Sequence, residues 1–257
     1  MSTSTAGRQV PPPRRPALDR AVAMRLARTE YARLADQLRE LTDDDWRAPT
    51  ACPEWDVHAM ACHVLGMAEM AASPLEARRQ TGAAAAAGGV FIDRLTALQV
   101  DKHRHRSPSD VVARLAAFGP KAARGRRMMP GLLRRRPMPQ EQPLDETGTV
   151  TETWTMGYLT DVILTRDPWM HRSDIAAATG RPMTLTPEHD GVLVADVVAE
   201  WAQRHGSPCR LTLTGPAGGS WGFGADGPEL QLDAVEFCRT LSGRGNGEGL
   251  LATRVPF

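Results

Sequence analysis

The segment LTDDDWRAPTACPEWDVHAMACHV, residues 41–64, determines how the first part of this chain folds. Pro49 and Pro53 leave room only for a short turn in its first half, because proline interrupts a helix. From Val57 onward, apolar residues recur at intervals of three and four, which predicts a helix with one buried face. His63 lies at the edge of that face, where its side chain can point into the interior of a helical bundle.

The same helical period occurs on both sides of this segment. It extends over Ala17–Leu41 and again over Thr149–Thr179, where Gly180 follows as a C-terminal cap. Shorter helices are expected near Val90–Gln99 and Ser109–Phe118. These patterns predict an all-helical unit.

The basic run Lys121–Arg136 has two interpretations. Gly125, Pro130 and Gly131 interrupt it, so it is predicted to be a surface loop. Such a run could bind nucleic acid or another anion, or it could simply be solvated. The whole chain holds 31 Lys and Arg against 30 Asp and Glu, for a net charge of +1. This balance favours the solvated loop and predicts no nucleic-acid partner.

The period of the sequence changes from helical to alternating after Gly206. Strands are predicted at Arg210–Thr214, Ser220–Gly224 and Glu229–Leu232, followed by a helix over Asp233–Ser242. This is the pattern of a small α/β unit that follows an all-helical one.

Three parts of the chain are therefore expected. Residues 1–16 are polar and proline-rich and are predicted to be a disordered tail. Residues 17–182 are predicted to form the helical bundle, and residues 183–257 the C-terminal α/β domain.

Composition narrows the class of protein. Apolar residues make up 42% of the chain and charged residues 24%, which is typical of soluble globular proteins. No apolar run reaches the length of a membrane span, and the start has no signal-peptide core, so a cytoplasmic protein without a membrane partner is expected.

The four cysteines form no CxxC pair and are predicted to be reduced. Cys62, beside His63, is either a metal ligand or a small core residue.

Three side chains could form a metal site. Asp167 and His171 are four residues apart, so one helix would present both on the same face. His63 would complete the set from a facing helix, and three protein ligands with an open position are typical of catalytic zinc. Two alternatives remain open: His63 is a core histidine, or Asp167 caps a new helix that begins at Pro168.

Two segments resemble a known family. Residues 41–64 are similar to the N-terminal signature of mycothiol-dependent maleylpyruvate isomerase family proteins. RDPWMHRSDIAAATGRP, residues 166–182, is similar to the family's acid-x-x-x-His motif, and residues 241–257 resemble its C-terminal ending. The resemblance covers most of residues 17–257, although residues 75–150 carry no matching motif. The matching residues of the first signature are Trp46, Pro49, Thr50, Cys52, Trp55, Val57 and His63.

The resemblance implies a fold, a cofactor and a chemistry. The implied fold is α+β, with an N-terminal DinB-like four-helix bundle followed by a small C-terminal α/β domain. His63, Asp167 and His171 fall on the ligand positions of a divalent metal of the zinc type. The implied enzyme uses the metal-bound thiolate of mycothiol, either to add to an activated double bond as a maleylpyruvate cis-trans isomerase or to act as an S-transferase. Its partners would be a small-molecule substrate and a low-molecular-weight thiol, and a monomer or homodimer is expected.

Further residues near the motifs have candidate roles. Arg244 is the candidate catalytic residue that binds a substrate carboxylate, because a guanidinium matches a carboxylate in bidentate geometry. Its alternative is a surface arginine after a helix cap. Arg172 and Asp174 are predicted to support the helix by local pairing or to contact the ligands.

A different class of function also fits this architecture. A helical bundle joined to a small α/β unit could enclose an apolar small molecule without catalysing a reaction. In that case the metal site would be degenerate or structural.

Overall fold

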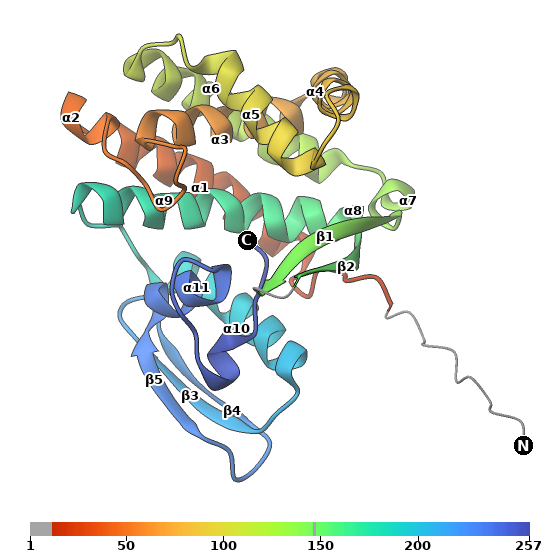
Figure 1. Ribbon diagram of the computed structural model, residues 1–257, viewed down its shortest axis with the longest axis vertical. Coiled ribbons are helices and arrows are strands. Elements are labelled where there is room, and N and C mark those ends of the chain that lie inside the picture. The colour runs from red at the N-terminus through yellow and green to blue at the C-terminus, as the bar shows by residue number, and fades with distance from the viewer. Residues whose placement is uncertain (1–11, 146–147) are drawn as a thin grey trace, which may run out of the picture.

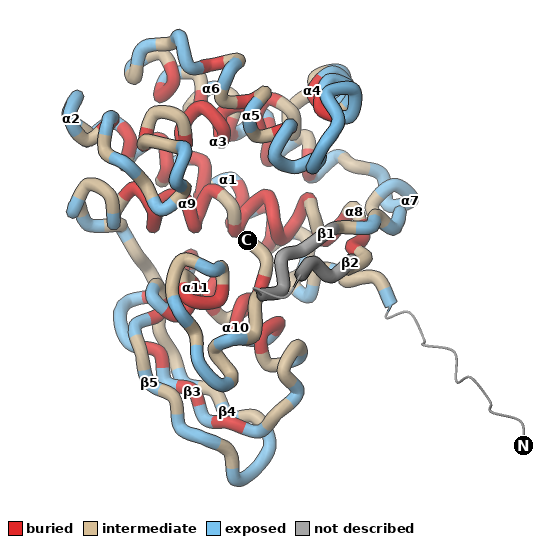
Figure 2. Tube along the Cα trace, viewed as in Figure 1, coloured by how far each residue is buried: buried red, intermediate tan, exposed pale blue. Residues whose placement is uncertain are grey.

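The computed structural model describes residues 12–145 and 148–257 (Figure 1). Four helices form an N-terminal bundle in which α6 packs against α1 and α3, and α9 packs against the same two helices. Figure 2 shows that buried residues run along α1, α3 and α9 at the centre of the molecule. The bundle helices are α1 (Arg20–Arg39), α3 (Val57–Ala72), α6 (Pro108–Met128) and α9 (Leu164–Thr179). The predicted four-helix bundle is thereby confirmed.

A helical hairpin is added to the bundle on α3. It consists of α4 (Pro74–Ala86) and α5 (Phe91–His103), which pack against each other and against α3. Gly66 on α3 permits the close approach of α5, because a Cβ at this position would lie 2.6 Å from the Cβ of Gln99. The missing side chain of Gly66 therefore sets how closely the hairpin packs.

The segment between the hairpin and α9 departs from the sequence prediction in two places. Part of the basic run, predicted as a surface loop, is the C-terminal end of α6, and Arg126 within it is 2% exposed. Gly125 does not end the helix there but lets it pack closely, since an added Cβ would lie 2.2 Å from the Ala71 carbonyl oxygen. Close packing on α3 therefore overrides the local loop signal.

The second departure is an antiparallel β-hairpin. Strand β1 (Pro137–Asp145) pairs with β2 (Gly148–Thr155), although a helix was predicted to start at Thr149. Helical structure begins only at Met156, after Thr155 caps the turn by accepting a hydrogen bond from Tyr158 N–H. The short elements of this region are α7 (Gly131–Arg134), α8 (Met156–Tyr158) and the π-turn η1 (Leu159–Ile163).

The C-terminal part is the predicted small α/β unit. Its three strands are ordered β4-β3-β5, with β3 antiparallel to β4 and parallel to β5. Helix α10 precedes the sheet and α11 follows it. The elements are η2 (Pro187–Gly191), α10 (Val192–His205), β3 (Cys209–Thr214), β4 (Gly219–Phe223), β5 (Glu229–Asp233), α11 (Ala234–Ser242) and η3 (Gly249–Ala252).

The two units share buried surface. Trp169 and Met170 of α9 and Leu26 of α1 belong to the same apolar cluster as α10, α11 and the sheet. Helices α1 and α9 therefore bury one face in the bundle and another against the α/β unit. Buried ion pairs of Arg172 link the two units, since its Nη1 lies 3.1 Å from both carboxylate oxygens of Glu30 in α1 and 3.4 Å from Asp190 Oδ1 in η2.

The chain start and the short second helix complete the fold. Residues 1–11 of the predicted disordered tail lie outside the described residues. Arg14, from the remainder of that tail, donates its N–H to the Thr153 carbonyl at 2.8 Å and so pairs with β2. Thr42 and Asp45 form a capping box at α2 (Asp43–Trp46), the short turn expected before Pro49. None of the helices in the described part of the chain has the length and apolarity that a membrane crossing needs.

Candidate metal centre

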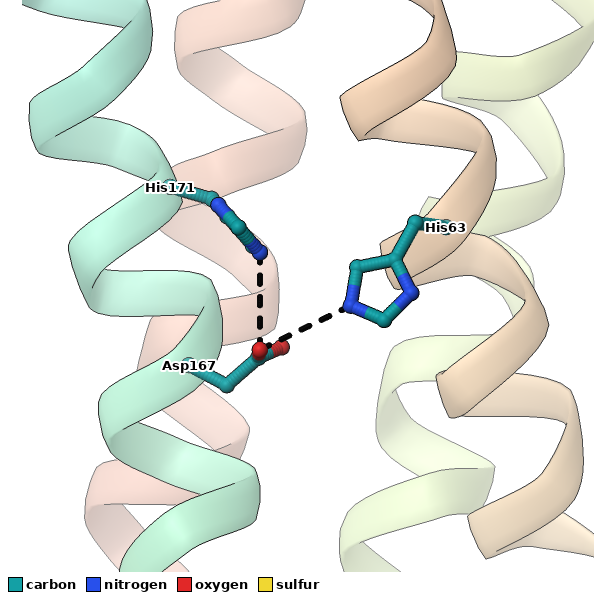
Figure 3. Close-up of side chains that lie close together, drawn as sticks. All are labelled: His63, Asp167 and His171. Atoms are coloured by element: carbon teal, nitrogen blue, oxygen red, sulfur yellow. Dashed lines mark ion pairs between the residues drawn. The ribbon is translucent and has the colours of Figure 1, made fainter. Parts of the chain in front are cut away.

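The three predicted ligands meet between α3 and α9 (Figure 3). Asp167 Oδ1 lies 3.5 Å from His63 Nε2 and 3.4 Å from His171 Nε2. Each residue offers one donor atom, and the three atoms lie within 4.8 Å of one another. A tetrahedral zinc ion binds nitrogen and oxygen at about 2.0–2.2 Å, which places two of its ligand atoms roughly 3.3 Å apart. The donor set and its spacing therefore fit a divalent metal of the zinc type.

The site is closed on the histidine side and open at the carboxylate. His63 is 3% exposed and His171 5% exposed, whereas the side chain of Asp167 keeps 20% of its surface accessible. The Trp55 ring packs over both imidazoles, with centroid distances of 5.0 Å to His63 and 6.2 Å to His171. A small ligand would reach the centre past Asp167.

Asp167 lies inside α9 and does not cap it. The helix begins at Leu164 and continues through Pro168, and no side-chain cap precedes it. Proline cannot donate to the carbonyl four residues earlier, which here is that of Leu164. The guanidinium of Arg126 replaces the missing donor, with Nη1 2.9 Å from the Leu164 oxygen. Because this bond lets the helix pass Pro168, Asp167 and His171 stay one turn apart on the same face.

A charged group from the same helix orients His171. Its Nδ1 lies 3.3 Å from Asp174 Oδ2, so a proton on Nδ1 leaves the Nε2 lone pair directed at the centre. Asp174 is fully buried and is held by two arginines of the C-terminal unit. Arg239 Nη1 donates to it at 3.0 Å, and Arg244 donates from Nε at 2.6 Å and from Nη2 at 2.7 Å.

The charges around Asp167 and Asp174 set the protonation of the site. Burial would lower the pKa of His171, but the charge of Asp167 and the hydrogen bonds to both aspartates raise it to about 9. Burial would raise the pKa of Asp167, but His171 and His63 lower it well below its usual range. Burial likewise opposes ionisation of Asp174, but hydrogen bonds from His171 and Arg244 hold its pKa at about 2. Both carboxylates are therefore anionic at neutral pH, as metal and histidine partners require.

A neutral group orients His63. Its Nδ1 lies 2.8 Å from the Gln99 side-chain oxygen of α5. Gln99 had no predicted role, because it lies at the end of a segment that carries no recognised motif. Its contact with His63 spans 36 residues of sequence and depends on how α5 docks on α3.

The remaining predicted residues take different places. Arg244 reaches the site, but its close contacts are with Asp174 rather than with an open cavity. Arg172 pairs with Glu30, away from the metal ligands, whereas Asp174 contacts His171 as predicted. Cys62 is fully buried, with its Sγ 3.9 Å from His58 Nδ1. Burial raises the pKa of its thiol to about 12. These contacts favour a core role for Cys62.

A second cluster of potential ligands is an ion-pair network. Glu30, His189 and Asp190 also bring donor atoms within 4.8 Å of one another. Arg172 and Arg33 already pair with these carboxylates, and His189 Nε2 lies 2.6 Å from Glu30. These arginines balance the charge of the two carboxylates and leave no uncompensated negative charge for a metal. The cluster instead joins α1, α9 and η2 through ion pairs.

Comparisons with known proteins identify a family and a shared fold. Residues 27–176 match a family model described as the mycothiol maleylpyruvate isomerase N-terminal domain. The fold is similar to a crystal structure of mycothiol-dependent maleylpyruvate isomerase, with a TM-score of 0.54 and 14% identity over 89% of this chain and 90% of that chain. A crystal structure of a histidine-to-alanine mutant of that isomerase gives a TM-score of 0.51, again at 14% identity over 89% and 90% of the two chains.

No curated protein matches the chain. At 14% identity, the two crystal structures establish a shared fold and nothing about the substrate. The family model spans more than half of the sequence, including His63, Asp167 and His171. The chain therefore belongs to the mycothiol maleylpyruvate isomerase N-terminal domain family.

Proposed function

We propose that this protein is a metal- and thiol-dependent enzyme, with His63, Asp167 and His171 as the metal ligands. The observation that supports it is the convergence of three donor atoms on one point that is accessible past Asp167. An isomerase that adds a thiol to an activated double bond is the reaction that we infer, since the family to which the chain belongs is that of the mycothiol maleylpyruvate isomerase N-terminal domain. An S-transferase would use the same site.

The charge of the ligand set suits a thiol cosubstrate. When bound, a divalent metal lowers the pKa of a coordinated thiol, so that the nucleophilic thiolate forms near neutral pH. Two neutral imidazoles and one carboxylate leave one positive charge on a divalent centre, which an anionic sulfur would neutralise. Mycothiol is the thiol that the family membership suggests.

Nearby side chains have roles that follow from their positions. Trp55 covers both imidazoles and would limit the access of water to them. Arg244 keeps its Nη1 on the Ser242 hydroxyl at 3.2 Å, a weaker partner than Asp174. A substrate carboxylate could replace this hydroxyl without breaking the pair with Asp174, so the substrate-binding role of Arg244 stays a prediction.

Metal content tests the proposal directly. Elemental analysis should find one metal per chain in the wild type and none in His63→Ala or His171→Ala. Asp167→Ala should bind metal weakly, because it removes the only anionic ligand. His105→Ala is the matched control, since His105 is exposed and lies outside the cluster, and it should retain the metal.

A positive result would justify assays of thiol-dependent isomerase and S-transferase activity. If the wild type binds no metal even after zinc is added under reducing conditions, the enzyme proposal fails. The non-catalytic ligand-binding alternative would then be preferred.

A further inference from the structure

A chain of buried side chains leads from α4 to His63. Gln80 and Gln99 are both fully buried. Gln80 Nε2 donates to the Gly66 carbonyl at 3.2 Å and to Glu76 Oε1 at 2.9 Å. Gln99 Nε2 donates to Gln80 Oε1 at 2.9 Å, and Gln99 Oε1 lies 2.8 Å from His63 Nδ1.

The direction of hydrogen bonding along these side chains is fixed at the end furthest from His63. The Gly66 carbonyl and the Glu76 carboxylate can only accept hydrogen bonds, so Gln80 must present its NH₂ group to them. Its oxygen then faces Gln99, which must donate its own NH₂ group in return. The oxygen of Gln99 is left to face His63, and His63 must carry its proton on Nδ1. When the ring is neutral, its Nε2 therefore carries the lone pair, on the side of Asp167.

The charge state of Glu76 makes this direction firm. Glu76 accepts hydrogen bonds from Arg79 at 2.9 Å and from Lys102. The bond from Arg79, together with that from Lys102 and despite partial burial, holds the pKa of Glu76 well below its usual range. A carboxylate that stays ionised cannot become a donor and reverse the chain.

We propose that the α4–α5 hairpin is a positioning element of the metal centre, in which Glu76, Gln80 and Gln99 hold neutral His63 as the tautomer whose Nε2 can bind metal. This inference rests on the proposed metal site. It adds a role for three residues that make no contact with the metal. Without them, the Asp167 carboxylate 3.5 Å from Nε2 would favour a proton on that nitrogen and block coordination.

The first test measures the tautomer in the metal-free protein. Nitrogen-15 NMR of the neutral imidazole, assigned by comparison with His63→Ala, should show the proton on Nδ1 in the wild type. Gln99→Met keeps the side-chain length but removes the acceptor, so the proton should move to Nε2. Gln80→Met leaves Gln99 in place but free to flip, and a mixture of tautomers is expected.

The second test measures zinc affinity by competition with a chelator. Gln99→Met should weaken binding roughly 10- to 100-fold, the usual effect of losing such a supporting contact. The double variant Gln80→Met with Gln99→Glu should restore affinity to near the wild-type value, because a carboxylate can only accept and has no reversed orientation. A role in packing alone would not predict this rescue.

Gln37→Met is the matched control. Gln37 donates from Nε2 to the Arg172 carbonyl at 3.0 Å and touches none of the three ligands. The proposal is overturned if Gln99→Met keeps the proton on Nδ1, or if it weakens zinc binding no more than Gln37→Met does. If the wild type binds no zinc at all, the proposed function fails, and the tautomer measurement still decides whether the chain of side chains acts as described.

Discussion

The two histidines of the candidate centre differ in what holds their second nitrogen. His171 faces the Asp174 carboxylate, whereas His63 faces the neutral amide of Gln99. A carboxylate partner stabilises the imidazolium, and an amide oxygen does so less. In the metal-free site, His171 is therefore the protonated histidine, with a pKa of about 9.

Zinc binding should release this proton. Because the pKa of His171 is raised, the ring is protonated below about pH 9 in the metal-free protein and must lose its proton to coordinate. Zinc affinity should thus rise by up to about tenfold per pH unit from pH 6.5 to 9 and then level off. Isothermal titration in buffers of different ionisation enthalpy would count about one released proton per chain at pH 7. An affinity that is flat over this range would contradict the assignment.

At the scale of elements, helix α9 supplies two of the three candidate metal ligands, and they lie on either side of a proline inside the helix. The Leu164 carbonyl that Pro168 leaves without a donor is bonded by Arg126, which also donates to the Thr160 carbonyl at 2.5 Å. A buried arginine on α6 thus maintains the helical register that aligns Asp167 with His171.

Arg126 and Pro168 should be energetically coupled. Arg126→Met is expected to cost about 3 kcal/mol of unfolding free energy, since it removes the buried donor to the Leu164 and Thr160 carbonyls. In a Pro168→Ala background the cost should be about 1 kcal/mol lower, because the alanine then supplies a backbone N–H that can bond the Leu164 carbonyl. Urea unfolding of the four proteins in this cycle measures the coupling. Strictly additive effects would show that Arg126 does not substitute for the missing donor.

The α4–α5 hairpin depends on one glycine. A Cβ at Gly66 would lie 2.6 Å from both Cβ and Cγ of Gln99, so Gly66→Ala should separate α5 from α3. Overpacking of this kind typically costs about 1–3 kcal/mol, more than the roughly 1 kcal/mol that alanine gains over glycine in a helix.

Gly82→Ala is the control for this change. Gly82 lies in α4 with no atom within 4 Å of an added Cβ, so the same substitution there should be stabilising by up to about 1 kcal/mol. Urea unfolding compares the two variants. Equal effects at both positions would mean that the hairpin can shift without loss of stability.

At the scale of the whole molecule, the α/β unit supports the metal centre. Arg239 lies on α11 and Arg244 just beyond its cap, and both bind Asp174. The orientation of His171 consequently depends on a unit that begins after the bundle ends. The shared apolar cluster around Trp169 holds the two units in the required position.

Asp174→Asn should therefore affect both stability and metal binding. It removes a fully buried carboxylate from two arginines, which is expected to cost about 3 kcal/mol, and to weaken zinc binding roughly 10- to 100-fold. Asp36→Asn is the control, since its pair with Arg39 is exposed and should contribute little. Urea unfolding and chelator competition measure the two effects. A normal zinc affinity in Asp174→Asn would show that the α/β unit does not contribute to metal binding.

Elements with local signals could be predicted from the amino-acid sequence. The helical period around Val57 and the alternating pattern at Arg210–Thr214 both appear in the structure where they were predicted. Three glycines end their helices in the left-handed conformation that glycine adopts without strain, namely Gly180, Gly206 and Gly243. The four-residue spacing of Asp167 and His171 predicted a shared helix face, but only the structure excluded the alternative that Asp167 caps a helix beginning at Pro168.

Which distant residues meet could be learned only from the folded chain. The β1–β2 hairpin and the continuation of α6 through Gly125 were mispredicted, because cross-strand pairing and close packing on α3 outweigh local propensity there. Gln99 contacts His63 across 36 residues of sequence, and Arg244 contacts Asp174 across 70. Local sequence sets periodicity and caps, whereas the second nitrogen of each ligand histidine is satisfied by whichever buried group the packing of helices brings within hydrogen-bonding distance.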